Sequence, residues 1–413
     1  MPIRRLGIFC LPGRGHLYPA TALGRRLKDR GFQVTVFNRN IARSIVQASG
    51  LLFQSLDDKD IGSIDFRSSP SCQLGPNTLD IMYDHSLLVL RQARNVLVKT
   101  GIDALLVDQL DFASGTVADI LGIPFVNLSF SPPLYLDDES PPFIFRWKPG
   151  IARLEKRRNK RGNILLRRLL TPIIDLVNDT RRAWRLPVIE DVNETFSRHA
   201  MITQMPKAFD FPRASAPPNL FHTGLFSHGE VPNLRFPWHR LDGRPLIYAS
   251  MGTVRNGSRQ VFETIAAASA AFNVQLVISL GGMALTPEDF LNLPGDPIVV
   301  HYGPQVSILG RATLTICHGG MNTTLESVYQ GVPLIAIPVT DDQPGVAARI
   351  EWRGVGLALR FRNLRVDRLR QCIQAVLTDG KYPSAARAMQ AQFRNVDGLS
   401  QAADIVERVL SLT

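Results

Sequence analysis

Short apolar segments alternate with amphipathic ones along the first half of the chain. The apolar segments have the length and composition of buried strands and lie at 6–11, 33–38, 104–107 and 124–129. Between them, apolar residues recur at helical spacing over 20–30, 87–99 and 113–121. This alternation predicts a parallel sheet covered by helices on both faces, in which ligands bind at the carboxyl ends of the strands.

A second series of the same kind occupies the rest of the chain. Its strand-like segments lie at 246–250, 275–280, 298–300, 314–317 and 334–337. Residues 211–244 are rich in Pro, Gly, Asn and His without a sustained period, which is typical of a linker. The pattern therefore predicts an α/β protein with two Rossmann-like, doubly wound domains that face each other across a cleft. We expect a first domain at 1–213, a linker at 214–243, a second domain at 244–395, and at 396–413 a C-terminal helix that could pack back on the first domain.

Composition sets the broad class of protein. The chain has 413 residues, of which 45% are hydrophobic and 20% charged, as expected for a soluble globular protein with more than one core. Its four cysteines (Cys10, Cys72, Cys317 and Cys372) are widely separated, which argues against a zinc site or a disulfide framework and favours a reducing compartment. The first apolar run is too short for a signal peptide, and no apolar run reaches the length of about eighteen residues that a membrane span needs. We therefore expect a cytoplasmic protein.

Positive charge is concentrated in one segment. The net charge is +11, and residues 146–168 carry ten Lys or Arg against one acidic residue, Glu155. Apolar residues such as Leu154 and Ile164 interleave with these charges, as in a helix that lies at a membrane surface. One hypothesis is therefore peripheral contact with anionic lipid on the inner face of the membrane, and a solvated helical face is the alternative. Nucleic acid is disfavoured because no nucleic-acid-binding motif accompanies the charge.

Two strand ends in the first half supply candidates for proton transfer. His16 lies in the glycine-containing loop after the first strand and can accept a proton near neutral pH, although a histidine that only caps the next helix is the alternative. Asp108 follows the strand at 104–107 and can orient such a histidine. Asp111 fits the start of the following helix better. The loop lacks the last glycine of the dinucleotide fingerprint, so we predict no NAD site.

The stretch 302–343 contains an anion-binding pattern. A strand at 314–317 continues through His318, Gly319 and Gly320 into a helix that begins near Asn322. Glycines let a ligand approach the backbone, and the N–H groups and dipole of a helix start favour a phosphate. Small hydroxyl and glycine residues at 250–253 also suit phosphate oxygens. The acidic pattern at 57–60 is interpreted as a charged surface turn rather than a Mg²⁺ site, because no strand end accompanies it.

Several motifs together resemble the nucleotide-sugar signature of family-one UDP-glycosyltransferases, which have the GT-B fold. The matching residues are His318-Gly319-Gly320, Asn322-Thr323, Glu326, Gly331-Val332-Pro333, Pro338 and Asp342-Gln343. His16 in its loop and Asp108 at its strand end also match, so the resemblance covers nearly the whole chain. Within the family, the segments 107–109, 318–323 and 342–347 are most similar to bacterial zeaxanthin (carotenoid) glucosyltransferases. Tyr302 and Met321 depart from plant members, which carry Trp at both positions.

The resemblance implies a role for each matching residue. His16 would be the general base and Asp108 its partner, in a domain that binds the acceptor. The UDP-sugar would be bound in the second domain by Ser250, Gly252, Thr253, Tyr302, Gln305, His318, Gly319, Gly320, Asn322, Thr323, Glu326, Asp342 and Gln343. By this resemblance Tyr302 would stack on uracil, Gln305 and Glu326 would hold the ribose, and Asp342 and Gln343 would bind the sugar hydroxyls. The resemblance implies neither a metal ion nor a cofactor, since the UDP-sugar is a co-substrate.

These implications lead to one functional hypothesis and two alternatives. We expect an inverting glycosyltransferase that moves glucose from UDP-glucose to a hydroxyl of an apolar acceptor and gives a β-glycoside. The acceptor expectation rests on the resemblance and on the aromatic, proline-rich stretch 130–147, and it leaves carotenoids, other terpenoids and phenolics open. The alternatives are a UDP-sugar epimerase on the same frame and a non-catalytic helper of another glycosyltransferase. The presence of both His16 and Asp108 argues against the helper.

Overall fold

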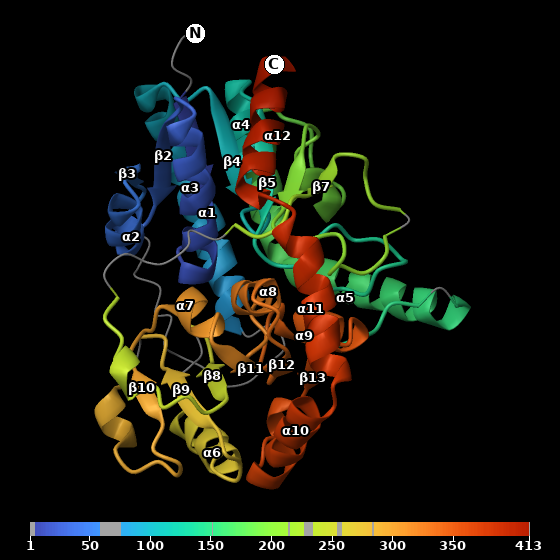
Figure 1. Cartoon of the computed structure of the whole chain (residues 1–413). Helices are drawn as coiled ribbons and strands as arrows, with labels where there is room; N and C mark the ends of the chain where they lie inside the picture. The colour runs from blue at the N-terminus through green and yellow to red at the C-terminus, as the bar shows by residue number, and fades with distance from the viewer. Residues whose placement is uncertain are drawn as a thin grey trace. The chain divides into compact units, whose positions relative to one another are not determined.

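The chain forms two compact units, shown in Figure 1. The computed structural model describes residues 5–57, 76–150, 152–213, 215–226, 234–253, 258–282 and 285–412. Unit 1 comprises Met1–Pro142, Pro149–Ser227 and Val396–Thr413, and unit 2 comprises Phe143–Lys148 and His228–Asn395. The short segment Phe143–Lys148 thus belongs to unit 2 although its neighbours on both sides belong to unit 1.

Unit 1 is built on a parallel sheet with the strand order β3-β2-β1-β4-β5-β6-β7. The strands are β1 (Arg5–Phe9), β2 (Gln33–Asn38), β3 (Leu52–Ser55), β4 (Ala104–Asp108), β5 (Phe125–Ser129), β6 (Met201–Thr203) and β7 (Leu220–His222). Ile8 in β1 pairs with Val36 on one side and with Leu106 on the other. These side chains are buried because helices cover both faces of the sheet, as the continuous apolar runs predict.

The helices of unit 1 come from both ends of the chain. They are α1 (Arg14–Asp29), α2 (Arg43–Ala48), α3 (Pro76–Thr100), α4 (Ser114–Leu121), α5 (Arg153–Ala183) and α12 (Gly398–Leu412), with short 3-10 turns at η1 (Asn40–Ala42) and η2 (Val192–Thr195). Helix α12 (red) lies beside α1 (blue) in Figure 1. Its residues Ala402 and Val406 are buried in the core of the first sheet. Arg30, at the end of α1, donates to Asp404 at 2.6 Å and to Glu407 at 3.2 Å.

Unit 2 repeats the same plan with the strand order β10-β9-β8-β11-β12-β13. Its strands are β8 (Leu246–Ser250), β9 (Gln275–Ser279), β10 (Ile298–Val300), β11 (Ala312–Cys317), β12 (Leu334–Ala336) and β13 (Gly356–Ala358). Its helices are α6 (Arg259–Ser269), α7 (Gln305–Leu309), α8 (Met321–Tyr329), α9 (Gln343–Trp352), α10 (Val366–Thr378) and α11 (Lys381–Arg394), with 3-10 turns η3 (Trp238–Arg240), η4 (Pro287–Phe290) and η5 (Phe361–Asn363). Both units are therefore doubly wound α/β domains, as the sequence predicts.

The expected linker and two of the expected helices differ from the sequence prediction. The expected linker 214–243 contains β7, which pairs with β6 and is held by Thr223, whose backbone N–H donates to the carbonyl of Thr203. The residues 214 and 227–233 of that linker lie outside the described residues, as do Asp58–Asp60 of the acidic pattern and Cys72. The helices expected at 20–30 and 87–99 begin earlier, at Arg14 and Pro76, so His16 lies in the first turn of α1 and not in a loop before the helix. No helix among the described residues combines the length and the apolar character that crossing a membrane requires.

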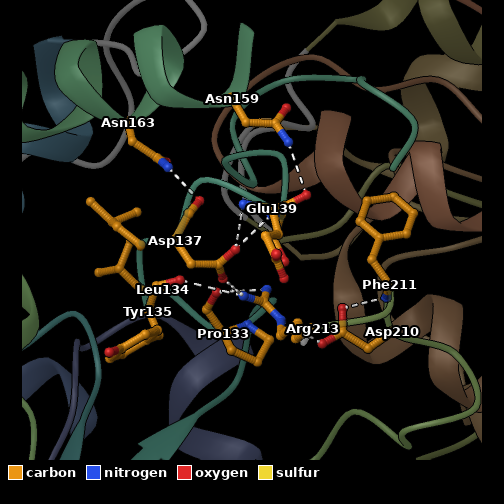
Figure 2. A network of polar contacts seen from close by, with 12 residues as sticks. Pro133, Leu134, Tyr135, Asp137, Glu139, Asn159, Asn163, Asp210, Phe211 and Arg213 are labelled. Carbon is orange, nitrogen blue, oxygen red and sulfur yellow. Dashed lines mark hydrogen bonds and ion pairs between the residues drawn. The ribbon is translucent and has the colours of Figure 1, made fainter. Parts of the chain in front are cut away.

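A buried arginine anchors the loop that follows β5. The guanidinium of Arg213 is 5% exposed and donates to Asp210 at 3.0 Å and to Asp137 at 3.3 Å. It also donates to the backbone carbonyls of Pro133 at 3.2 Å and Tyr135 at 3.3 Å. Figure 2 shows these partners around the guanidinium. Because one cation holds two buried carboxylates and two carbonyls, the first part of this proline-rich loop is fixed to the body of unit 1.

Candidate active site

Both sheets carry polar residues where the strand order reverses. In unit 1 the reversal lies between β1 and β4, and His16 follows β1 while Asp108 ends β4. In unit 2 it lies between β8 and β11, whose last residues Ser250 and Cys317 are register partners. Loops that leave adjacent strands in opposite directions open a crevice at that point, which is where open α/β sheets bind ligands. Each unit therefore has one candidate ligand-binding edge.

His16 and Asp108 form a hydrogen-bonded pair in unit 1. Nδ1 of His16, in the first turn of α1, lies 2.6 Å from Oδ2 of Asp108. The backbone N–H of Leu110 donates to Oδ1 of this carboxylate at 3.0 Å, and that of Leu11 donates to Oδ2 at 3.4 Å. The Asp108 side chain is 0% exposed and the His16 side chain 23% exposed. A ligand can therefore reach the imidazole but not the carboxylate that orients it.

The tautomer of His16 follows from this geometry. An ionised carboxylate only accepts hydrogen bonds, so a neutral His16 donates from Nδ1–H to Asp108 and carries its basic lone pair on Nε2. The rings of Phe130 and His16 make a T-shaped contact, with 6.0 Å between ring centroids and 85° between ring planes. Carboxylate and aromatic ring together fix the orientation of the imidazole, a geometry that suits a general base.

A second histidine–aspartate pair lies deeper in unit 1. Nε2 of His85 lies 3.1 Å from Oδ2 of Asp111, and both side chains are almost completely buried. Asp111 also accepts from the backbone N–H groups of Ala113 at 3.0 Å and Ser114 at 2.9 Å, so it serves the start of α4. Burial alone raises the pKa of Asp111, but the charge and hydrogen bond of His85 and the bonds from Ser114 lower it below its usual value. This pair stabilises the start of α4 and is not accessible to a ligand.

In unit 2, the ring of His318 lies between two glycines. Gly252, after β8, has φ +81°, and a Cβ placed on it would lie 2.7 Å from the His318 ring. A Cβ on Gly320, the residue that precedes α8, would overlap the same ring. Any side chain at either position would therefore displace His318. The glycines hold this imidazole at the N-terminal end of α8, where the positive end of the helix dipole favours an anion.

Burial makes His318 a neutral side chain at physiological pH. Desolvation lowers its pKa to about 4, although a hydrogen bond with the backbone of Ser250 acts in the opposite direction. Nδ1 of His318 is buried and has no hydrogen-bond partner among the described residues. His318 therefore offers hydrogen-bonding nitrogen atoms rather than a fixed positive charge.

A chain of side-chain hydrogen bonds links three elements beside His318. The amide nitrogen of Gln305, in α7, donates to Glu326, in α8. The amide oxygen of Gln305 accepts from the hydroxyl of Tyr248, in β8, at 2.9 Å and from that of Thr323 at 3.4 Å. Burial raises the pKa of Glu326 to about 7, and the bond from Gln305 opposes the shift. This partly buried carboxyl can therefore change its protonation state near neutral pH.

The start of α9 is tied to the loop that precedes it. The side-chain oxygen of Gln343 accepts from the backbone N–H groups of Val339 at 2.8 Å and Thr340 at 3.2 Å. Gly319 has φ +82°, and a Cβ on it would lie 3.3 Å from the carbonyl of Gln343. The glycine therefore allows the loops after β11 and β12 to pack closely, which sets the position of the amide group of Gln343.

The family assignment comes from comparison with known proteins. The sequence model of the family described as "UDP-glucoronosyl and UDP-glucosyl transferase" matches residues 188–402, more than half of the chain. The chain belongs to this family. It is therefore a UDP-dependent glycosyltransferase, as the motifs predict.

Relatives that match the transferase along nearly its whole length include two named enzymes. The zeaxanthin glucosyltransferase of Pantoea ananas is 26% identical over 408 residues, which cover 97% of this chain and 94% of that protein. The 4'-demethylrebeccamycin synthase of Lentzea aerocolonigenes is 24% identical over 425 residues, which cover 98% and 99%. These two relatives are named for different products, so the likeness assigns the family and not the acceptor.

Solved structures confirm the GT-B fold of the transferase. The glycosyltransferase of kitacinnamycin aligns with a TM-score of 0.76 at 21% identity and covers 99% of this chain and 100% of its own. The calicheamicin glycosyltransferase CalG4 aligns with a TM-score of 0.74 at 20% identity and covers 100% and 99%. The expectation of two Rossmann-like domains of GT-B type is thus confirmed.

The structure gathers the predicted site residues into two sets. In unit 1, His16 and Asp108 are directly bonded. In unit 2, the predicted residues lie at or after the ends of β8, β10 and β11, on α7 and α8, and at the start of α9; they are Ser250, Gly252, Thr253, Tyr302, Gln305, His318, Gly319, Gly320, Asn322, Thr323, Glu326, Asp342 and Gln343. The functional role of each one stays a prediction.

Two further side chains lie beside these sets: Phe130, which the sequence places only in the aromatic stretch 130–147 and not beside His16, and Tyr248, to which the sequence gives no role. Phe130, which packs on His16, is the residue after β5, and only the fold brings it to α1. Tyr248, which donates to Gln305, is an inner residue of β8 that looks like ordinary core. The described residues contain no group of three or more His, Cys, Asp or Glu that could hold a metal ion.

Proposed function

We propose that the transferase moves glucose from UDP-glucose to a hydroxyl group of an apolar acceptor, with inversion at the anomeric carbon. The observation that carries the proposal is the His16–Asp108 pair, in which a fully buried carboxylate orients a partly exposed imidazole. In the proposed reaction, Nε2 of His16 removes the acceptor proton while the acceptor oxygen attacks the anomeric carbon. Direct displacement of UDP from an α-linked donor then gives a β-glycoside.

Unit 2 would stabilise the departing UDP. The proposed diphosphate site is the start of α8 with His318, Asn322, Thr323, Ser250 and Thr253. The N–H groups of a helix start and the helix dipole favour negative charge there, and Nδ1 of His318, which has no hydrogen-bond partner among the described residues, supports the assignment. Because the helix dipole and these polar groups stabilise the negative charge of UDP without an ion, we propose that neither a metal nor a cofactor takes part.

Glu326 and Gln305 are proposed to hold the ribose of the donor. An ionised carboxylate can accept from two neighbouring hydroxyls, and charge-assisted bonds of this kind are about twice as strong as neutral ones. The bond from Gln305 already orients the Glu326 carboxyl before a ligand binds. Tyr302 is proposed to stack on uracil, and Asp342 and Gln343 to bind the sugar hydroxyls.

The proposed acceptor class is apolar, with carotenoids, other terpenoids and phenolics as candidates. Support comes from Phe130 beside His16 and from the zeaxanthin glucosyltransferase of Pantoea ananas among the relatives. The aromatic stretch 130–147 is divided between the units: Phe130 and Tyr135 belong to unit 1, while Phe145 and Trp147 stack on each other in unit 2, with 4.0 Å between centroids.

A product screen tests this proposal. The pure protein is incubated with UDP-glucose, UDP-galactose or UDP-GlcNAc and a panel of carotenoids, sterols and flavonoids, and products are detected by mass. The coupling constant of the anomeric proton then reports inversion or retention. His16→Ala should abolish product formation without weakening UDP binding, and EDTA should leave the rate unchanged. Unchanged turnover by His16→Ala would refute the base assignment, and a large loss with EDTA would refute metal independence.

The two alternatives receive less support. A non-catalytic helper has no need of an oriented base, and the His16–Asp108 pair argues against it. An epimerase would change the donor sugar without any acceptor. Conversion of UDP-glucose to UDP-galactose in the absence of acceptor would favour it over the transferase.

A further inference from the structure

The N-terminal half of α5 presents an exposed face of alternating cationic and apolar side chains. At 3.6 residues per turn, six exposed residues fall within about 100° of the helix circumference and extend over about 20 Å of its length. They are Leu154, Arg157, Arg161, Ile164, Leu165 and Arg168, and we call them the α5 face. The side chain of Leu154 is 76% exposed, that of Leu165 45% and that of Ile164 41%. Few large apolar side chains elsewhere among the described residues are as exposed as Leu154.

The cations of the α5 face have no acidic partners in the part of the chain that the structure describes. Neighbouring basic residues are paired, since Lys156 lies 3.1 Å from Glu139 and Arg167 lies 2.6 Å from Asp191. Arg157, Arg161 and Arg168 form no ion pair with any described residue. Pairs of opposite charge three or four residues apart stabilise an exposed helix, and the α5 face contains none.

The C-terminal half of α5 has a different character. There Arg182 pairs with Asp179 at 2.8 Å and Arg181 with Asp119 at 2.7 Å. Unbalanced positive charge and exposed apolar side chains thus coincide in the same half of the helix, whereas the other half is an ordinary charged surface.

The opposite side of the same half helix holds the loop after β5. Asn159 donates to the carbonyl of Glu139 at 2.9 Å, and Asn163 donates to that of Asp137 at 2.6 Å. Figure 2 shows both amides pointing at this loop, whose other side is bound by Arg213. A surface that binds to the α5 face would therefore lie one helix diameter, about 10 Å, from this loop.

We propose that the α5 face binds the surface of an anionic lipid bilayer, with the arginines among the headgroups and Leu154, Ile164 and Leu165 inserted at the acyl boundary. Interfacial helices combine cationic and large apolar side chains in this way. Nucleic acid would satisfy the arginines but leave the three apolar side chains in water. The inference extends the proposed function, because an apolar acceptor partitions into bilayers, but lipid binding is measured without any acceptor or donor and can fail or succeed independently.

Flotation of the full chain with liposomes tests this inference. Vesicles of pure phosphatidylcholine are compared with vesicles that contain 30% phosphatidylglycerol, at about 50 and 500 mM NaCl. We expect binding to the anionic vesicles at low salt and much weaker binding to the neutral ones. The triple variant Arg157→Gln, Arg161→Gln, Arg168→Gln should lower the partition coefficient roughly 100-fold.

A matched control separates this face from net charge. Arg362, Arg365 and Arg370 are exposed in unit 2, and their replacement by Gln removes the same charge elsewhere. This variant should bind lipid within about threefold of the unchanged protein. Leu154→Ser with Leu165→Ser should weaken binding about tenfold without any change of charge. Circular dichroism and UDP affinity verify that each variant is folded.

Three outcomes would overturn the inference. The first is absence of flotation with anionic vesicles at low salt. The second is an equal loss of lipid binding in the triple variant of the α5 face and in the triple variant of unit 2, which would mean that net charge alone attracts the protein to the vesicles. The third is an unchanged partition coefficient in the double serine variant, together with retention of the protein on RNA, which would identify a polyanion site instead.

Discussion

Replacement of Asp108 by asparagine tests how the proposed base is oriented. The carboxylate oxygen Oδ2 accepts from Nδ1 of His16 at 2.6 Å and from the backbone N–H of Leu11 at 3.4 Å. In Asp108→Asn, the position of Oδ2 beside Nδ1 of His16 is taken either by the NH₂ group or by the amide oxygen. The first arrangement forces His16 to accept at Nδ1 and to carry its proton on Nε2, where it can no longer act as a base. The second leaves the NH₂ group against the N–H of Leu110.

The expected loss of rate follows from the role assigned to the pair. General base catalysis contributes about 10² to 10⁴, and inversion of the histidine tautomer by the same substitution in a Ser-His-Asp triad costs about 10⁴. We expect kcat to fall by about 10³ to 10⁴, which corresponds to about 4–5.5 kcal/mol of transition-state stabilisation. One backbone N–H loses its acceptor, so the free energy of unfolding should fall by about 1–3 kcal/mol.

The assay is product formation at saturating UDP-sugar and acceptor, with UDP affinity measured by calorimetry on the same samples. Asp111→Asn provides a matched control, because Asp111 is also buried and bonded to a histidine, His85. The control should lose stability through the start of α4 but keep kcat within about threefold. Retention of kcat in Asp108→Asn, or an equal loss in both variants, would refute the catalytic role of the pair.

Three other predictions concern charged groups. Burial raises the pKa of Glu326 from 4.5 to about 7, so the contribution of this carboxyl to stability is fully present below pH 4.5 and is lost as the pH rises through 7. In denaturant titrations, Glu326→Gln should therefore raise the free energy of unfolding by about 3 kcal/mol at pH 8 and have little effect at pH 4. The same substitution should weaken UDP binding. The pKa of His318 is about 4, and a bound diphosphate should raise it because negative charge favours the protonated imidazole. Calorimetry at pH 6 in buffers of different ionisation enthalpy should therefore detect proton uptake on UDP binding, and this uptake should be smaller in His318→Gln. Arg213→Met should cost about 3–5 kcal/mol of stability, since it leaves Asp137 and Asp210 buried without their cation, whereas Arg213→Lys should cost less.

The fold was predictable where strands are continuous apolar runs. Segments such as 104–107 are buried on both faces, so their composition alone identifies them. The strands β6, β7 and β13 have three residues each and contain Thr203, His222 and Gly356, so no continuous run of apolar side chains marks them and pairing with a neighbour defines them. The strands β10 and β12 are equally short but have apolar side chains throughout, and they were predicted. The first turns of α3 contain Asp80, Asp84 and His85, which hide its apolar stripe, so the predicted helix began too late.

The positions of the candidate site residues were predictable from the sequence, but their protonation states were not. The rule that ligands gather at strand ends identified His16 and Asp108, and the fold brings those ends together. The protonation states were not predictable, because they depend on burial that local sequence does not encode. His318 is neutral rather than cationic, and Glu326 changes its protonation state near pH 7. The contact of Gln305 with Tyr248 likewise joins two elements far apart in the sequence.

The position of α12 has a consequence for synthesis of the protein on the ribosome. Ala402 and Val406 complete a core that β1 and β2 begin, yet they are translated after all of unit 2. At about 5–20 residues per second, the nascent N-terminal sheet waits roughly ten to thirty seconds for its last helix. During that interval an apolar surface beside α1 is uncovered and open to chaperones or to aggregation. A chain cut after Asn395 would keep every strand of both sheets and still leave this surface open permanently.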